Sequence, residues 1–209
     1  MELSTLRYGR TSFADAQPIL RNWNATVVPD QSCAQGICSA RISLGDFVYR
    51  HAVFFSHHQH LFWAYGILGG RPAAISAGVS FRDGVLHSKS YFVGIEVFPH
   101  ESAAFGFTAI GYSLLAETEI ADALPLRRRN TSIRSQHPTY EVGSPGGCEV
   151  CISIWAHFSG SASAADVARI GAIDSSCLSR WFRPCRLKAD IMPAAWRIQE
   201  SESPYARPD

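Results

Sequence analysis

The stretch Ile75–Val97, ISAGVSFRDGVLHSKSYFVGIEV, has the clearest structural pattern in the chain. From Ile75 to Phe81 an apolar residue occupies every second position, and small or polar residues lie between. Alternation of this kind is typical of a β-strand with one buried face. The pair Asp83-Gly84 suits the centre of a tight hairpin turn, because both positions need positive φ. The stretch therefore predicts a β-hairpin, with Val85–Val97 as the returning strand.

Other parts of the sequence predict further strands around this hairpin. The predicted strands are Ala40–Phe55, Leu61–Leu68, Ala103–Leu115 and Cys148–Phe158. They are rich in apolar, β-branched and aromatic residues, as strands usually are. In the last of them Ile154 and Phe158 share one face, and His157 lies on the other. This number of strands favours a β-dominated chain.

Two short helices accompany the predicted strands. Thr11–Trp23 has helical character, and Asp15 is its expected N-cap. Ser163 and Asp166 form a capping pattern before a second helix near residues 163–173. Together these elements predict a β-dominated α+β fold, in which an antiparallel meander or sandwich-like sheet carries the helices.

The length of 209 residues fits a single domain over residues 1–209. We expect its core between residues 12 and 200, and a frayed tail at 201–209. A composition of 46% apolar and 18% charged residues excludes a disordered chain, a collagen-like fibre and a coiled coil. Residues 121–147 are rich in Pro, Arg and Gly and predict a long loop. Loops this long inside a compact domain are usually functional or mobile.

The six cysteines lie in three pairs that are close in sequence. The pairs are Cys33/Cys38, Cys148/Cys151 and Cys177/Cys185. An even count with local pairing favours disulfides formed in an oxidising compartment. Free thiols buried as small apolar groups are the alternative.

The Cys148/Cys151 pair is less simple than the other two. Residues three apart on an extended strand face opposite sides, so these two thiols would not pair with each other. Cys151 would then need a partner elsewhere, such as Cys177 or Cys185. A four-thiolate zinc site made by Cys148, Cys151, Cys177 and Cys185 is a further alternative.

The sequence gives an indirect indication of the compartment. Residues 1–21 lack the apolar run of a signal peptide, whereas the cysteines favour an extracytoplasmic location, periplasmic or secreted. The longest stretch without a formal charge, His51–Gly70, contains the polar run His57-His58-Gln59-His60. Because a lipid-facing helix tolerates such a run poorly, no transmembrane segment is predicted.

The same histidine run is the sharpest candidate for a metal site, with zinc or another divalent metal as the ion. If the segment is extended, His58 and His60 point to one face and His57 to the other. Two imidazoles on one face supply half of a catalytic metal site, which needs a third ligand and an open position. The candidates for that third ligand are His51, His87, His100 and His157. The alternative is a solvated polar turn between two strands.

Charge is unevenly distributed although the formal net charge is only +1. An acidic stretch over residues 90–126 is followed by two clusters of arginines. The clusters are Arg127, Arg128 and Arg129, and Arg180, Arg183 and Arg186. Planar guanidinium groups suit phosphate or carboxylate ligands, so an anion site is a hypothesis. A nucleic-acid partner is disfavoured, because a real footprint normally shifts the net charge as well.

Motifs for catalysis are absent from the sequence: there is no nucleophile elbow, phosphate-binding loop, dinucleotide fingerprint or His-Glu-x-x-His motif. The favoured hypothesis is a non-catalytic, β-rich module for binding or assembly, with a protein partner or a second copy as its ligand and no cofactor. A metal-dependent enzyme that uses His58 and His60 is the first alternative. A polyanion-binding protein that uses the two arginine clusters is the second.

Overall fold

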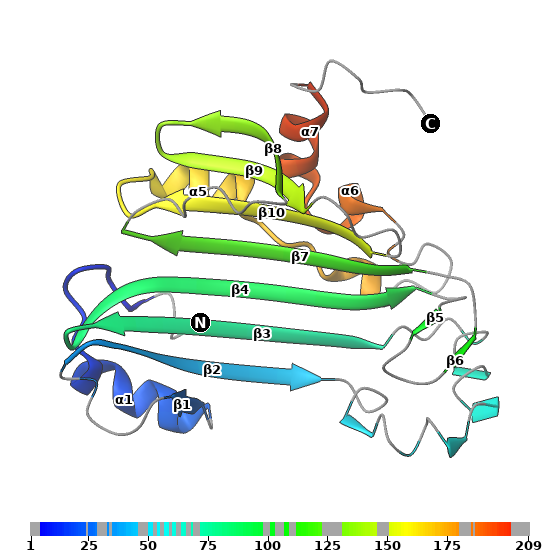
Figure 1. The fold of residues 1–209 in the computed structure, drawn as a ribbon, viewed down its shortest axis with the longest axis horizontal. Coiled ribbons are helices and arrows are strands. Elements are labelled where there is room, and N and C mark those ends of the chain that lie inside the picture. The colour runs from blue at the N-terminus through cyan, green and yellow to red at the C-terminus, as the bar shows by residue number, and fades with distance from the viewer. Residues whose placement is uncertain are drawn as a thin grey trace.

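The protein folds around one eight-stranded β-sheet that crosses the whole molecule (Figure 1). Its strands are β1 (Thr26–Val28), β2 (Ile37–Gly45), β3 (Ala73–Arg82), β4 (Val85–Val97), β7 (Tyr112–Ala121), β8 (Thr131–His137), β9 (Tyr140–Pro145) and β10 (Cys151–Ser159). Their order in the sheet is β1-β2-β3-β4-β7-β10-β9-β8. The computed structural model describes residues 5–23, 25–28, 33, 35–45, 50–51, 54, 57–58, 60–61, 64–65, 68, 72–97, 101–102, 107–108, 112–122, 131–145, 151–179, 185 and 187–201. The fold is α+β and β-dominated, as the sequence predicts.

The predicted hairpin is formed by β3 and β4. Asp83 and Gly84 make its turn with φ values of 50° and 79°, so both positions have the left-handed conformation that the Asp-Gly pair predicts. A bulge between Ser80 and Phe81 shifts the register near the turn. The hairpin provides the two central strands on which the N-terminal half of the sheet is built.

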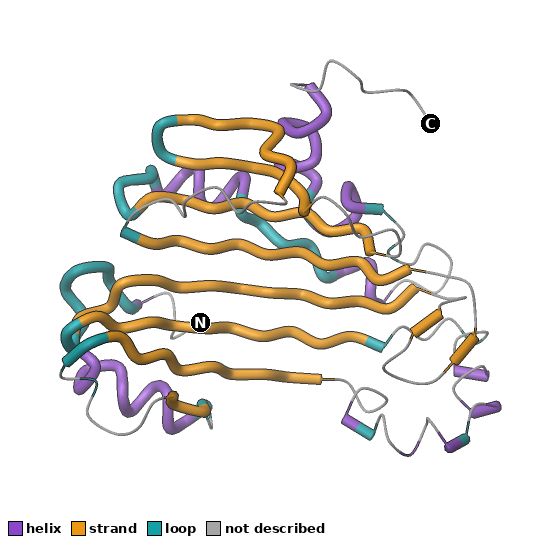
Figure 2. The backbone as a smooth tube through the Cα atoms, in the orientation of Figure 1, coloured by secondary structure: helices purple, strands orange, loops and turns teal. Residues whose placement is uncertain are grey.

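The C-terminal half of the sheet departs from a simple meander. β7 pairs antiparallel with β4, but its other neighbour is β10, and that pairing is parallel. The hairpin β8–β9 then extends the sheet beyond β10 (Figure 2). Residues 131–145 therefore form two strands within the range 121–147, where a long loop was predicted.

Two of the strand predictions are wrong. β2 ends at Gly45, so the predicted strand Ala40–Phe55 is cut short. Within Leu61–Leu68 the described residues Leu61, Ala64 and Tyr65 are helical, and the amide of Leu68, in a turn, donates to Ala64 O at 3.0 Å. Apolar runs without strict alternation do not distinguish a strand from a buried helix. The predicted strand Ala103–Leu115 contains the short β6 (Phe107–Thr108), which pairs with β5 (Glu101–Ser102), and the start of β7.

Two of the helices begin at side-chain caps. Helix α1 (Phe13–Asn22) has Ser12 as its N-cap, and the Asp15 amide donates to Ser12 Oγ at 3.1 Å. Asp15 is therefore the third helical residue and not the cap, and its hydrogen bonds from Ser12 lower the pKa of its carboxyl group. Helix α5 (Ala164–Ile170) begins at Ser163, as predicted. Towards the C-terminus follow η2 (Ser176–Ser179), α6 (Lys188–Ile191) and α7 (Pro193–Ser201).

Helices α1, α5, α6 and α7 pack against one face of the sheet, which we call the helical face. Helix α1 packs on β2 and β3, where Phe13 meets Phe81 edge to face with ring centroids 5.2 Å apart. Helices α5, α6 and α7 pack on β7, β10 and β9, where Phe158 is fully buried. The strand register places both hydrophobic clusters on the same side of the sheet. No helix among the described residues is long and apolar enough to cross a membrane.

Candidate metal centre

The opposite face of the sheet carries a row of polar side chains across four neighbouring strands. The register aligns Ser90 of β4 with Glu119 of β7, Glu119 with His157 of β10, and His157 with Glu141 of β9. The next row along the strands aligns Phe92, Glu117 and Trp155. Neighbouring strands lie about 4.8 Å apart, so aligned side chains on one face are in reach of each other. We call Glu117, Glu119, Glu141, Trp155 and His157 the polar centre.

The middle of the polar centre is buried. His157 is 7% exposed, Trp155 is 6% exposed and Glu141 is 4% exposed. The imidazole of His157 stacks on the indole of Trp155, with ring centroids 4.5 Å apart and 23° between the planes. This stacking fixes the plane of the imidazole. Burying ionisable groups is costly, so their convergence here calls for a chemical reason.

Three side chains of the polar centre bring potential ligand atoms together. One nitrogen of His157 and one carboxylate oxygen each from Glu117 and Glu119 lie within 4.8 Å of one another. Two atoms that are each about 2.1 Å from one ion can be at most about 4.2 Å apart. Both glutamates are half-buried, so their side chains have room to rotate. A small rotation would bring the ligand atoms from within 4.8 Å to within about 4.2 Å of one another. The three residues are therefore close to a metal-binding arrangement.

Glu141 stands on the other side of the histidine. Its Oε1 lies 3.7 Å from His157 Nδ1, and both side chains are more than nine-tenths buried. A carboxylate beside one nitrogen of a histidine orients the ring and makes the other nitrogen a better ligand. The arrangement thus contains a candidate ligand set together with a group that would support it.

The predicted histidine site lies elsewhere in the molecule. The described residues between 50 and 65 are mostly helical and lie beyond the end of β2, away from β10 (Figure 2). His58 Nδ1 lies 2.9 Å from Phe54 O, and the rings of His58 and His60 are 6.1 Å apart. The strand geometry expected for His57, His58 and His60 is therefore wrong, while metal binding by them stays a prediction.

Two of the candidates for a third ligand, His87 and His157, lie in or at the end of sheet strands. His157 belongs to the polar centre. His87 Nδ1 lies 2.7 Å from Asp122 Oδ2, and this contact links β4 to the residue that follows β7. His100 lies outside the described residues. The structure thus brings His157 together with glutamates and not with His58 or His60.

Two cysteine pairs form disulfides, as predicted. Cys33 bonds to Cys38, and Cys177 bonds to Cys185. Because Cys177 and Cys185 bond to each other, neither can be the partner of Cys151, and a four-thiolate zinc site with them is excluded. Cys148 lies outside the described residues. The four bonded cysteines are buried within the two hydrophobic clusters.

The predicted anion-binding arginines cannot be placed in a site. Arg127, Arg128 and Arg129, and Arg180, Arg183 and Arg186, lie outside the described residues. Lys188, which follows Arg186 by two residues in the sequence, has its Nζ 5.6 Å from the centre of the Trp196 ring. Anion binding by the arginine clusters stays a prediction.

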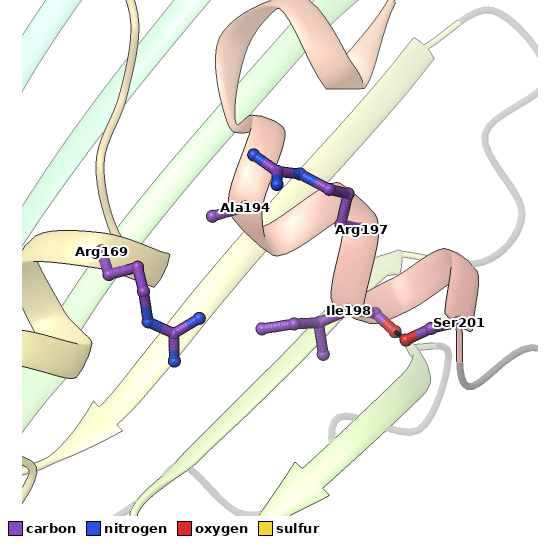
Figure 3. A pocket seen from close by; sticks show the side chains of 5 residues that line it. All are labelled: Arg169, Ala194, Arg197, Ile198 and Ser201. Carbon is purple, nitrogen blue, oxygen red and sulfur yellow. Dashed lines mark hydrogen bonds between the residues drawn. The ribbon is translucent and has the colours of Figure 1, made fainter.

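A groove of about 450 Å³ lies between α5 and α7 (Figure 3). It is lined by Arg169, Ala194, Arg197, Ile198 and Ser201. Arg169 donates to Asp166 Oδ1 at 3.0 Å, and Arg197 Nε donates to Pro193 O at 3.3 Å. In Figure 3 the Arg197 guanidinium runs back along α7 and does not face that of Arg169. The two guanidinium groups therefore do not converge on one anion.

A lysine is buried on the helical face. Lys89 is 8% exposed, donates from Nζ to Leu6 O at 2.7 Å and lies 5.0 Å from the centre of the Tyr8 ring. Burial lowers the pKa of Lys89 and raises the pKa of Tyr8 and of Tyr91. The partners of Lys89 come from the N-terminal segment, so its contacts tie that segment to β4.

Sequence reasoning treated Glu117 and Glu119 only as part of an acidic stretch and did not single out Glu141. A signal was present, because two glutamates at positions i and i+2 of a strand point to the same face. The parallel pairing of β7 with β10 supplies the histidine, and no local pattern predicts that pairing. Comparisons with protein-family models, curated proteins and solved structures find no match to this chain.

Proposed function

We propose that this protein is a β-rich binding module that binds a cationic ligand at its polar centre. The observation that carries the proposal is the convergence of Glu117, Glu119 and His157, whose ligand atoms lie within 4.8 Å of one another. Two adjacent strands of a rigid sheet hold these groups, which favours binding because little has to be ordered when the ligand arrives.

The chemistry of the polar centre favours a cation over other ligands. Three carboxylates surround one imidazole, and Glu141 and His157 are removed from water. An interaction between charges strengthens as the effective dielectric constant falls, so a cation at this position would be attracted strongly. The indole of Trp155 could also contact an organic cation through its face.

We extend the proposal to the compartment in which the module works. The disulfides Cys33–Cys38 and Cys177–Cys185 are compatible with an extracytoplasmic location. Disulfides persist in oxidising compartments and are rare in the cytosol. A periplasmic or secreted binding module is consistent with the two disulfides and with a cation site at the polar centre.

Thermal unfolding in the presence of a panel of cations tests the proposal. The panel contains Zn²⁺, Mn²⁺, Ca²⁺, spermidine and tetramethylammonium, each titrated against the protein with its disulfides intact. A ligand that binds only the folded state stabilises it by about 2.7 kcal/mol when its concentration is 100 times Kd. We expect at least one cation to raise Tm in a dose-dependent manner.

A pair of matched variants locates the effect. Glu119→Gln should abolish the rise in Tm, whereas Glu200→Gln, an equal change at an exposed position on α7, should leave it intact. The proposal is contradicted if no cation raises Tm, or if the rise is the same in Glu119→Gln as in the unaltered protein.

A further inference from the structure

We infer that the cation bound at the polar centre is a divalent transition metal ion held by Glu117, Glu119 and His157. The inference rests on the proposed function, which requires only that some cation binds there. It assigns the ligand atoms, a supporting carboxylate from Glu141 and a preference among metals.

The donor set selects the class of metal. One imidazole nitrogen and two carboxylate oxygens suit Zn²⁺, Mn²⁺ and Fe²⁺. Ca²⁺ and Mg²⁺ take oxygen ligands, and Ca²⁺ needs six or more of them. Mixed nitrogen and oxygen sites generally bind Zn²⁺ more tightly than Mn²⁺. Among these ions, Zn²⁺ is therefore expected to bind most tightly to the three residues.

The geometry divides the ligands into a fixed one and two adjustable ones. His157 is 7% exposed, its ring stacks on the Trp155 ring, and Glu141 Oε1 lies 3.7 Å from its Nδ1. Glu117 and Glu119 are half-buried on the neighbouring strand and share one face of it. A buried histidine thus anchors the ion, and the two glutamates close around it.

Three protein ligands leave the coordination of the ion incomplete. Zinc sites built for catalysis or for ligand exchange have three protein ligands and a water in the next position. Glu141 has a different role: its carboxylate faces Nδ1 of His157, so it would act as a positioning residue for the imidazole. Outer carboxylates of this kind typically change metal affinity by about 10-fold to 100-fold when altered.

Equilibrium dialysis of the 209-residue chain against Zn²⁺, with its disulfides intact, followed by metal analysis, tests the inference. We expect one Zn²⁺ per chain, with weaker binding of Mn²⁺ and no stoichiometric binding of Ca²⁺. Replacement with Co²⁺ should give visible absorption bands that report a mixed imidazole and carboxylate ligand set.

Variants separate this site from the histidine run. Glu117→Gln/Glu119→Gln should lose stoichiometric zinc, Glu141→Gln should raise Kd by about 10-fold or more, and Glu200→Gln should behave as the unaltered chain. A His57→Ala/His58→Ala/His60→Ala variant should retain its zinc. Unchanged circular dichroism and Tm in EDTA establish that each variant is folded, and His157→Gln provides a second test of the anchor ligand.

The inference is overturned if zinc stays stoichiometric in Glu117→Gln/Glu119→Gln, or if the His57, His58 and His60 substitutions remove it. Both outcomes would assign the ion to another site. If spermidine or tetramethylammonium raises Tm through Glu119 while no metal ion binds there, the metal assignment fails and the proposed cation-binding function stands. If no cation binds, both fail.

Discussion

Both faces of β10 are buried, but they hold different chemistry. On the helical face Ile154, Ala156 and Phe158 are at most 1% exposed and pack with the core that α5, α6 and α7 cover. On the opposite face Trp155 and His157 are buried beside glutamates. Burial of aliphatic and aromatic groups stabilises a fold, whereas burial of imidazole and carboxylate groups stabilises little or costs free energy. The comparison indicates that the helical face determines stability and that the polar centre is suited to binding.

The largest expected effect on stability comes from Phe158→Ala. Phe158 is fully buried and contributes to the cluster beneath α5. Removing a buried phenyl ring should lower the free energy of unfolding by about 3–5 kcal/mol, because it loses apolar burial and leaves a cavity. Urea denaturation measures the loss. A loss below about 1 kcal/mol would contradict the expectation that burial on the helical face stabilises the fold.

A smaller loss is expected when the disulfide of the helical face is removed. The bond Cys177–Cys185 closes a segment with a sequence separation of 8, and Cys33–Cys38 one with a separation of 5. The chain-entropy model gives about 2.5 kcal/mol for the first and about 2 kcal/mol for the second. Double Cys→Ala variants, compared by urea denaturation without reductant, measure both values. Equal stability of the Cys177→Ala/Cys185→Ala variant and the unaltered protein would contradict the expectation.

The smallest expected effect appears only at alkaline pH and concerns Tyr8. Burial raises the pKa of Tyr8 in the folded protein, and the unperturbed phenol titrates near 10.0. The stability that depends on neutral Tyr8 is therefore complete below pH 10 and is lost as the pH rises further. Between pH 10 and 11 the free energy of unfolding should fall less in Tyr8→Phe than in the unaltered protein. The difference between the two decreases is at most about 1.4 kcal/mol per pH unit.

Denaturation curves from pH 9 to 11 measure this difference. Lys89, whose lowered pKa changes stability in the opposite direction, is present in both proteins, so the difference between them isolates Tyr8. Parallel curves for the two proteins would show that Tyr8 titrates normally. Tyr8 would then make no contribution to stability that depends on its staying neutral.

The parts of the fold that were predicted correctly are those with local signals. The Asp83-Gly84 turn, the alternation from Ile75 to Phe81 and the Ser163 cap each depend on a few neighbouring residues. The hairpin β8–β9 was missed because its turn at Pro138-Thr139 lacks an Asp-Gly pair and its strands lie in a segment rich in Pro and Gly.

The polar centre was predicted only in part, for a related reason. Alternation in Cys148–Phe158 placed His157 on the face opposite Ile154 and Phe158, and the register agrees. The glutamates reach the histidine only because β7 and β10 are parallel neighbours in the sheet. In the sequence the β8–β9 hairpin separates these two strands. Pairing between distant strands is set by the packing of the whole sheet, which a local pattern does not report.

That parallel pairing has a consequence for the order of folding. The β3–β4 and β8–β9 hairpins involve neighbouring residues, and isolated hairpins form in about 1–10 μs. Glu119 and His157 come together only when β10 pairs with β7, and the chain between these strands contains the β8–β9 hairpin. Contacts between distant segments form more slowly because a longer loop must close first. Assembly of the polar centre would therefore follow the hairpins, and capture of a cation there would report that the sheet is complete.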